Sequence, residues 1–364
     1  MRTPLLFAIL FCLLAGGGIA QNKKPNPDDG YTPVVAPDKK KKDRDVTQAL
    51  ALPPELPAAV TADTNRLAFQ VTPLSSKGLL SQQTRDALKT LLHSNRGPIV
   101  KLRAFVSGSG DLRRIGDIAG EMFLEKHMPL PALTVAQVGA LPLEGAQVVI
   151  EATEVDRKVV NPSGVGFLAA QPAPTVAESL AKLKSILAAS GIQPSDALIV
   201  TCFVSSLEDQ RDTQPAMAAS FPGVALDYVQ MQRGPVLPAA SCEATARLAN
   251  PSASTNSQMA VVSNPEIVIT GTQLAFGSQD ADLKLAFERL EKALVVKNAR
   301  LDRVVLSHLY VTSSALTSRA VALQSAQSGG ARLSTVLPVE ALPSLDAALG
   351  LEVVAVPDSA AARP

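Results

Sequence analysis

The sequence has no tryptophan, and only 4% of its 364 residues are aromatic. Because proteins that bind single-stranded nucleic acid stack the bases on aromatic side chains, this scarcity argues against that class of protein. An excess of one charge is also missing, since 34 Lys and Arg residues stand against 33 Asp and Glu residues, for a formal net charge of +1. We therefore expect neither nucleic acid nor an anionic membrane surface as the main partner.

Histidine is rare as well, and the common cofactor motifs are missing. The three histidines, His93, His127 and His308, stand in unlike sequence contexts without the spacing of metal ligands, so we expect structural roles for them and no metal site. The sequence contains no phosphate-binding loop, no dinucleotide fingerprint and no nucleophile elbow. We therefore expect a protein that works without a cofactor.

A long apolar run occurs only at the N-terminus. Residues 5–14 are almost continuously apolar, Arg2 precedes them, and Gly18-Ile19-Ala20 supplies small residues at a cleavage position. This pattern is typical of a secretory signal peptide, and the run is short for a membrane span. We predict a signal peptide over residues 1–20 and a secreted or periplasmic protein with no stable membrane insertion after cleavage. An uncleaved anchor is the alternative.

The segment that follows is rich in proline and charge. Residues 21–58 hold seven prolines and the charged run 39–45, with few apolar residues. Such a composition buries too little apolar surface to offset the entropy of ordering, so we predict a disordered linker over residues 21–58.

Cysteine is too scarce for a disulfide scaffold. Removal of the signal would take Cys12 away and leave Cys202 and Cys242, both on predicted strands. The two can pair if their strands are neighbours, but two buried free thiols are the commoner outcome in such a chain.

Beyond the linker, the same order of elements appears three times. The clearest marker is a helical apolar stripe with spacings of 4, 3 and 4, which occurs at Val176, Leu180, Leu183 and Leu187, at Leu283, Phe287, Leu290 and Leu294, and more weakly at Thr84, Leu88, Leu91 and Asn95. A strand follows each of these helices, at residues 99–107, 198–205 and 304–312. A second helix comes next, at residues 112–125, 208–220 and 316–326, and two extended segments close each copy. We predict three tandem α+β modules, called modules 1, 2 and 3, over residues 59–156, 157–252 and 253–364.

The modules resemble the RidA/YjgF family, also called L-PSP. The residues that carry the resemblance are Gly271-Thr272-Gln273, residues 166–171 and 298–312, and above all residues 131–142 leading to Val149-Ile150-Glu151-Ala152. The resemblance implies a chorismate-mutase-like fold and, because family members are homotrimers, an intramolecular pseudo-trimer formed by a monomeric chain. Active members hydrolyse enamines and imines to ketones and ammonia in clefts between subunits.

The resemblance also implies site residues. An arginine after a Pro-Ala pair would bind the carboxylate of a 2-imino acid, and a glutamate on the last strand would position or deprotonate water. The glutamate is present as Glu151, Glu243 and Glu352, but Leu133 and Leu226 replace the arginine in modules 1 and 2.

Module 3 leaves the arginine position open between two residues. A strict count back from Pro343 places Ser334 there, whereas a one-residue bulge would restore Arg332, which follows Ala331 as in the family dipeptide. Thr270 and Gln273 resemble the polar pair beside the family cleft.

Two functional hypotheses follow from these residues. The first is a protein that binds a small molecule in its inter-module clefts and is catalytically degenerate in modules 1 and 2, where the leucines favour a less acidic, more apolar ligand or a partner protein. Ser334, Thr270, Gln273, Glu151 and Glu243 are the candidate ligand-binding residues, although the lack of an arginine partner favours a structural role for Glu151 and Glu243. The alternative is an enamine/imine deaminase that converts a 2-imino acid to a 2-keto acid and ammonia in one cleft of module 3, with Glu352 and Arg332 as its catalytic residues. A structural envelope protein on a flexible tether is a third reading.

Overall fold

The computed structural model describes residues 53–358 apart from 210, 235–237, 251–253 and 329–332. The predicted signal peptide, most of the predicted linker and Arg332 lie outside the described residues. Over the part of the chain that is described, no helix combines the length and the apolar character needed to cross a membrane.

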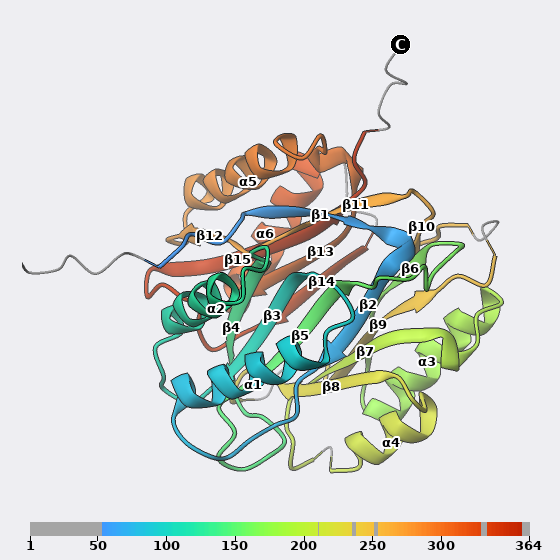
Figure 1. Cartoon of the computed structure of the whole chain (residues 1–364), viewed down its shortest axis with the longest axis horizontal. Helices are drawn as coiled ribbons and strands as arrows, with labels where there is room; N and C mark the ends of the chain where they lie inside the picture. Colours follow the sequence, from blue (N-terminus) through green and yellow to red (C-terminus); the bar gives the residue numbers. More distant parts are fainter. Residues whose placement is uncertain (1–52, 210, 235–237, 251–253, 329–332, 359–364) are drawn as a thin grey trace, which may run out of the picture. The chain divides into compact units, whose positions relative to one another are not determined.

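The first sheet is formed by module 1. Its strands follow the order β2-β5-β3-β4, with β3 and β4 parallel and the other pairs antiparallel. Helices α1 and α2 lie together over one face of this sheet (Figure 1). The elements are β2 (Leu67–Val71), α1 (Leu80–Ser94), β3 (Ile99–Ser107), α2 (Arg113–Glu125), β4 (Ala132–Val138) and β5 (Val148–Val155).

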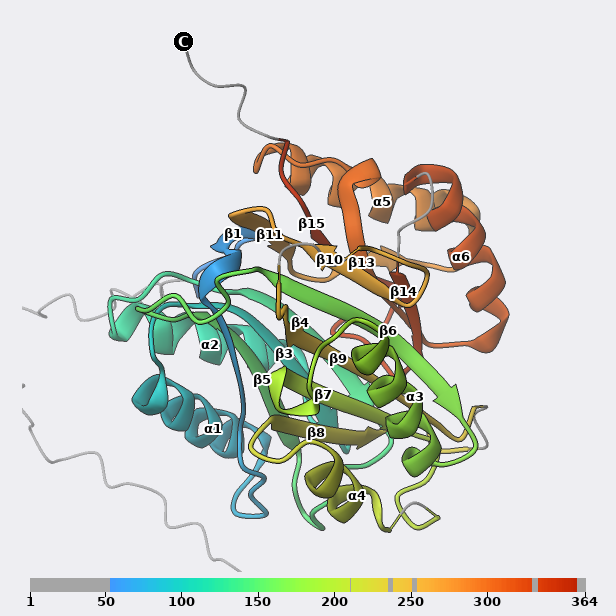
Figure 2. The same ribbon diagram turned by 90° about the vertical axis from the view of Figure 1, so that its right-hand side faces the viewer.

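The second sheet repeats this arrangement in module 2. Its core order is β6-β9-β7-β8, again with one parallel pair, β7 and β8. Helices α3 and α4 cover its outer face (Figure 2). The elements are β6 (Val165–Ala173), α3 (Val176–Ala189), β7 (Ala197–Val204), α4 (Thr213–Ser220), β8 (Ala225–Gln230) and β9 (Ala240–Arg247). Helix α4 begins five residues later than predicted, and it places Pro215 in its first turn, where proline is tolerated.

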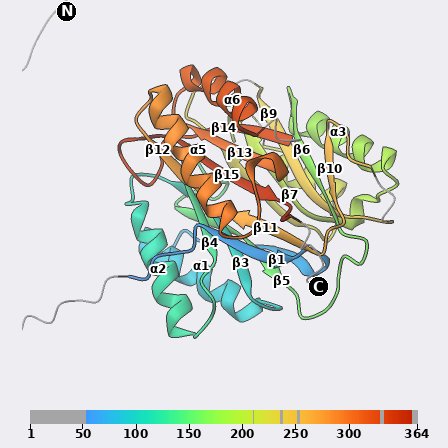
Figure 3. The same cartoon turned by 90° about the horizontal axis from the view of Figure 1, so that it is seen from above.

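The third sheet has the same core order, β11-β15-β13-β14, with β12 pairing with β15 as well. Helices α5 and α6 cover one face of it (Figure 3). The elements are β11 (Glu266–Thr270), β12 (Gln273–Phe276), α5 (Asp280–Val295), β13 (Val304–Val311), α6 (Ser314–Ser328), β14 (Leu333–Pro338) and β15 (Ala347–Ala355). Short 3-10 helices span Thr64–Arg66, Pro194–Asp196 and Leu301–Arg303.

Two strands join a sheet other than that of their own predicted module. Strand β1 (Ala59–Asp63) pairs antiparallel with β11 of the third sheet, and the two run side by side in Figure 1. Strand β10 (Met259–Val262), from the start of module 3, pairs with β6 of the second sheet. The edges of the sheets are thus shared between segments far apart in the sequence.

The predicted apolar stripes fill the space between each helix pair and its own sheet. Leu180, Leu183 and Leu187 of α3 are buried against β7 and β9, and the stripe of α5 is buried in the same way in module 3. Thr175 caps α3 by accepting a hydrogen bond from the backbone N–H of Glu178 at 3.2 Å. Periodicity of 3.6 residues therefore located the face of each helix that is covered.

The opposite faces of the sheets are also apolar, and they meet in two shared clusters. One cluster includes Phe105, Phe203 and Tyr310, one from each module. The other includes Leu67, Phe167 and Leu306. The central strands β3, β7 and β13 each contain a β-bulge, just before Lys101, Ile199 and Leu306 respectively. The extra residue of each bulge faces the second cluster.

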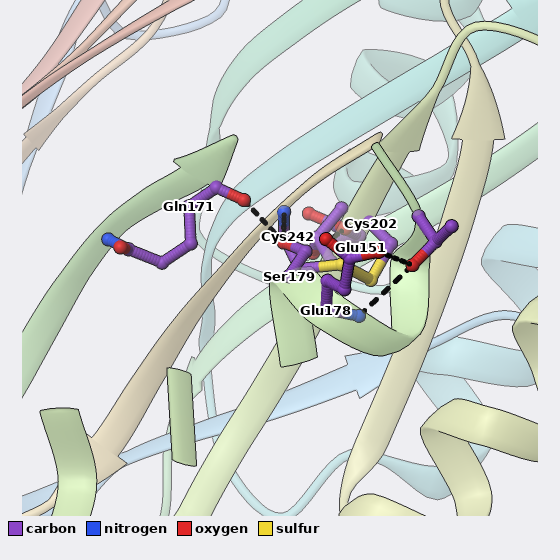
Figure 4. The surroundings of a disulfide bond; sticks show 8 residues. Glu151, Gln171, Glu178, Ser179, Cys202 and Cys242 are labelled. Carbon is purple, nitrogen blue, oxygen red and sulfur yellow. Dashed lines mark hydrogen bonds between the residues drawn. A yellow bond between two sulfur atoms is a disulfide. The ribbon is translucent and has the colours of Figure 1, made fainter. Parts of the chain in front are cut away.

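Cys202 and Cys242 form a disulfide, so the expectation of two free thiols was wrong. The two residues lie directly opposite each other on β7 and β9, with their Cα atoms 4.1 Å apart. Figure 4 shows Ser179 of α3 beside the bond, where its hydroxyl accepts a hydrogen bond from the Cys242 N–H at 2.8 Å and donates one to the Gln171 carbonyl. The disulfide is fully buried and fixes the centre of the second sheet.

Candidate functional site

The three predicted glutamates lie on the inner faces of the three sheets. Glu151 stands opposite Arg103, Glu243 opposite Thr201, and Glu352 opposite His308, so each module presents one strand pair of the same kind. These side chains meet in one buried group, the central charge cluster, which consists of Lys101, Arg103, Glu151, Glu243, His308 and Glu352. The resemblance assigned the glutamates to separate clefts, whereas the structure gathers them in one place.

Arg103 joins module 1 to module 2. Its Nε atom donates to Glu151 Oε2 at 2.6 Å, and its Nη1 atom donates to Glu243 Oε1 at 2.9 Å. The hydroxyl of Thr201 donates to the other oxygen of Glu151 at 2.6 Å. Burial opposes the charge of Arg103, but Glu151 and Glu243 outweigh it and raise the pKa of the guanidinium well above its ordinary value.

His308 joins module 3 to module 2. Its Nε2 atom lies 2.9 Å from Glu243 Oε2, and its Nδ1 atom lies 3.3 Å from Glu352 Oε1. Burial alone would lower the pKa of His308, but the charge of Glu243 and hydrogen bonds to both glutamates raise that pKa to about 9. Burial likewise favours neutral Glu243, yet His308 and Arg103 lower the pKa of Glu243 to about 2. The imidazole is therefore charged at neutral pH.

Glu352 joins module 3 to module 1, and both of its oxygens are occupied. Oε2 accepts hydrogen bonds from Lys101 and Thr134 of module 1. Oε1 accepts one from the Tyr310 hydroxyl at 2.7 Å and lies beside His308. Burial would raise the pKa of Glu352, but Lys101 and His308 hold it well below its ordinary value. Burial lowers the pKa of Lys101, and Glu352 opposes that change.

Asp227 of β8 stands at the edge of the central charge cluster, where its surroundings favour the protonated carboxyl group. It lies opposite Thr201 and forms a hydrogen bond with Glu151. Burial and the negative charge of Glu151 raise the pKa of Asp227 well above its ordinary value. Its Oδ2 atom is buried without a hydrogen-bond partner. The same strand position holds Thr134 in module 1 and Thr335 in module 3.

The remaining predicted site residues that the structure describes, Ser334, Thr270 and Gln273, lie on β14, β11 and β12. Ser334 stands opposite Ser307, in the register that Leu133 and Leu226 occupy in the other modules, so the strict count from Pro343 gives the observed alignment. The Ser334 hydroxyl donates to Gln324 at 2.8 Å.

Thr270 and Gln273 both belong to the backbone framework of module 3. The Thr270 hydroxyl accepts a hydrogen bond from Val353 N–H at 2.9 Å, and its carbonyl accepts one from Lys101 at 2.6 Å. Gln273 opens β12 and pairs with Leu351 of β15. The structure brings Thr270 to the edge of the central charge cluster.

A cavity of about 250 Å³ lies between modules 2 and 3, next to Ser334. It is called the module 2/3 cleft, and its lining residues are Ala170, Pro172, Phe203, Val204, Ser205, Met231, Pro238, Ser241, Ser334, Thr335, Val336, Leu337 and Pro338. None of these lining residues is ionisable. The hydroxyl of Thr335 is buried and has no hydrogen-bond partner in the described structure.

The corresponding place between modules 3 and 1 is closed by backbone contact. Thr272 N–H donates to the Leu133 carbonyl at 3.1 Å, and a Cβ atom on Gly271 would stand 2.9 Å from that same oxygen. The glycine thus permits the close approach of two chain segments, and no ligand-sized space separates them there.

Sequence reasoning missed two of the three cations of the central charge cluster. Lys101 and Arg103 alternate on one face of an otherwise apolar strand, which is the signal that could have identified them. Arg103, Thr201 and His308 also stand at equivalent positions of the three central strands, but their residue types differ too much to suggest one site.

No protein-family model and no curated protein matches the chain. Solved structures do match parts of it. A YjgF-family member from Mycobacterium tuberculosis is 24% identical and covers 24% of this chain and 77% of its own, with a TM-score of 0.23. Yeast Mmf1 is 21% identical and covers 30% of this chain and 90% of its own, with a TM-score of 0.23. RidA from an Antarctic Psychrobacter is 18% identical and covers 24% of this chain and 79% of its own, with a TM-score of 0.22. Among solved structures, this chain is thus similar to members of the YjgF/RidA family, each of which matches about a quarter of it.

Proposed function

We propose that this chain is an exported RidA-like protein that binds a small uncharged molecule in the module 2/3 cleft. The observation that carries the proposal is the lining of that cleft, which combines apolar side chains with hydroxyl-bearing residues, among them Thr335, whose hydroxyl is buried and unpaired. A buried polar group without a partner costs free energy, and a ligand that hydrogen-bonds to it recovers that cost.

The central charge cluster has a structural role in this proposal, as the contact that holds three modules together as an intramolecular pseudo-trimer. Lys101 pairs with Glu352, Arg103 with Glu243, and Glu243 with His308, so each pair of modules shares at least one ionic contact. The common strand order of the three sheets supports the same arrangement. Lys101 and Arg103 both lie on β3 of module 1. Three identical copies of module 1 would repeat both cations beside each glutamate, so they could not reproduce this balance of charge.

The chemistry of Glu352 favours binding over hydrolysis. A general base works best when its pKa lies near the working pH and when it can reach a water molecule. Glu352 has a pKa held well below its ordinary value, and both of its oxygens are already occupied by protein groups. We therefore assign it to the framework, together with Glu151 and Glu243.

The lining of the cleft also selects against acids. A carboxylate entering it would lose hydration, and no described residue of the lining offers a positive charge in return. A neutral ligand that contacts Phe203, Met231 and Val336 and hydrogen-bonds to Thr335 fits better. The volume of about 250 Å³ lies just below the usual range for drug-sized ligands, so we expect a smaller molecule.

The deaminase remains the competing proposal because Arg332 immediately precedes β14 in the sequence. The experiment compares the two on the chain from residue 21 onward. A panel of small neutral compounds and their carboxylate analogues would be screened by thermal shift, and ammonia release from a freshly generated 2-imino acid would be measured in parallel.

We expect neutral compounds to raise the melting temperature and the protein to leave ammonia release at the uncatalysed rate. Thr335→Val should weaken binding about fivefold, the effect of one hydrogen bond, whereas the matched variant Thr61→Val, at an exposed strand position, should not. Accelerated ammonia release that disappears in Glu352→Gln would establish the deaminase instead.

A further inference from the structure

A second cavity, of about 100 Å³, lies where the three sheets meet beside the central charge cluster. We propose that this central cavity is a binding site for a small primary alcohol of about four or five heavy atoms. The site is separate from the module 2/3 cleft, because the two share no lining residue.

The walls of the central cavity are apolar and come from all three modules. They include Leu67, Phe69, Phe167, Ile199, Ile267 and Leu306. The floor is the central charge cluster, every member of which lines the cavity. A ligand in this space would therefore need an apolar body and a polar end, and it would exclude water from apolar walls.

The ionic groups of the floor restrict the charge of the ligand. Each cation already contacts at least one glutamate, and each glutamate contacts at least one cation. A charged ligand would have to displace one of these partners and leave it buried without a counter-charge, which is strongly unfavourable. The occupant should be electrically neutral.

Two threonines define the polar contact that remains available. Thr153 on β5 and Thr245 on β9 occupy equivalent positions, two residues after the glutamate of their module, and both line the central cavity. Neither hydroxyl has a hydrogen-bond partner in the described structure, and Thr245 is only 7% exposed. Module 3 has Val354 at the matching position. This position of the cavity lining is thus polar in modules 1 and 2 and apolar in module 3.

A primary alcohol meets these requirements with a single functional group. Its hydroxyl can donate to one threonine and accept from the other, and its alkyl part can contact the isoleucines. The volume sets the size, because an apolar cavity of about 150 Å³ in another protein admits benzene, and 100 Å³ is smaller by about a third.

The test uses the chain from residue 21 onward, labelled at isoleucine methyl groups, and titrates it with 2-methyl-1-propanol. We expect saturable shifts of the methyl signals of Ile199, Ile267 and Ile269, which line the central cavity. Ile115, in the helix-facing core of module 1, serves as the internal control and should not shift. Isobutylammonium and isobutyrate, which have similar shapes but carry a charge, should produce no saturable shift.

Thr245→Val and Thr153→Val, measured separately, should each weaken the alcohol about fivefold, whereas Thr61→Val should leave the affinity unchanged. Thr245→Leu, which also fills part of the space, should abolish the shifts while the folded methyl spectrum is retained. The proposal is overturned if the alcohol gives no saturable shift, if a charged analogue binds as tightly, or if both valine variants bind like the wild type.

Discussion

His308 should make the stability of the protein fall as the pH rises from neutral to mildly alkaline. The imidazole lies between Glu243 and Glu352, and these partners raise its pKa from 6.5 to about 9. Between those two values the folded protein keeps a proton that the unfolded chain has released. The stabilisation is therefore complete below about pH 6.5 and is lost progressively as the pH approaches 9.

The size of the effect follows from the same values. One pKa unit corresponds to about 1.4 kcal/mol, so a rise from 6.5 to about 9 corresponds to about 3 kcal/mol of unfolding free energy. Glu243 reports the same contact from the acidic side, since a pKa of about 2 instead of 4.5 means that stability is lost as the pH falls from about 4.5 to 2. The two figures describe one interaction and are not additive.

Urea denaturation at intervals between pH 6 and pH 9 measures this dependence. His308→Gln should flatten the curve, whereas His93→Gln, at an exposed position of α1, should leave its slope unchanged. Measurements should stop near pH 9, because burial lowers the pKa of Lys101 from 10.5, and this adds a contribution of the opposite sign on the alkaline side. A wild-type stability that is constant or rises from pH 6.5 to 9 would refute the reasoning.

Three further perturbations test other contacts. Replacing both Cys202 and Cys242 with alanine should lower the unfolding free energy by about 2–4 kcal/mol, as expected for a disulfide that closes a loop of this length. Titration of free thiols in the denatured chain from residue 21 onward should detect none, and two free thiols would contradict the disulfide. The wild type should lose stability relative to Asp227→Asn as the pH rises above 3.8, because folded wild-type protein keeps a proton on Asp227 that its unfolded chain has released. A variant that is less stable than the wild type in urea at pH 7 would contradict this prediction. Gly271→Ala should lower the unfolding free energy by about 1–3 kcal/mol, because its Cβ would stand 2.9 Å from a carbonyl oxygen. The control Gly116→Ala inside α2, where a Cβ would make only an ordinary van der Waals contact, should be neutral or slightly stabilising in the same assay.

The module pattern could be predicted because each helix carries its own apolar stripe. Leu180, Leu183 and Leu187 mark a covered face without any knowledge of what covers it, and the count from Pro343 to Ser334 uses only local spacing. Both kinds of information lie within a few dozen residues of chain. Periodicity is therefore sufficient to place helices and strands in each module.

The central charge cluster could not be predicted in this way because its contacts join distant segments. Lys101 and Glu352 are 251 residues apart in the sequence. Nothing local indicates that the face of β3 that carries Lys101 meets the face of β15 that carries Glu352. The disulfide was missed for a related reason, since the pairing of β7 with β9 depends on the strand order of the sheet.

A double-mutant cycle between Lys101 and Glu352 is the most direct test of the claim that a shared ionic cluster joins the modules. The variants Lys101→Met, Glu352→Gln and their combination would be compared by urea denaturation at pH 6. We expect each single change to be strongly destabilising and the coupling energy to be about 1.5 kcal/mol or more, as for close charge pairs in other proteins. Single effects that simply add, with a coupling energy within about 0.5 kcal/mol of zero, would contradict the claim.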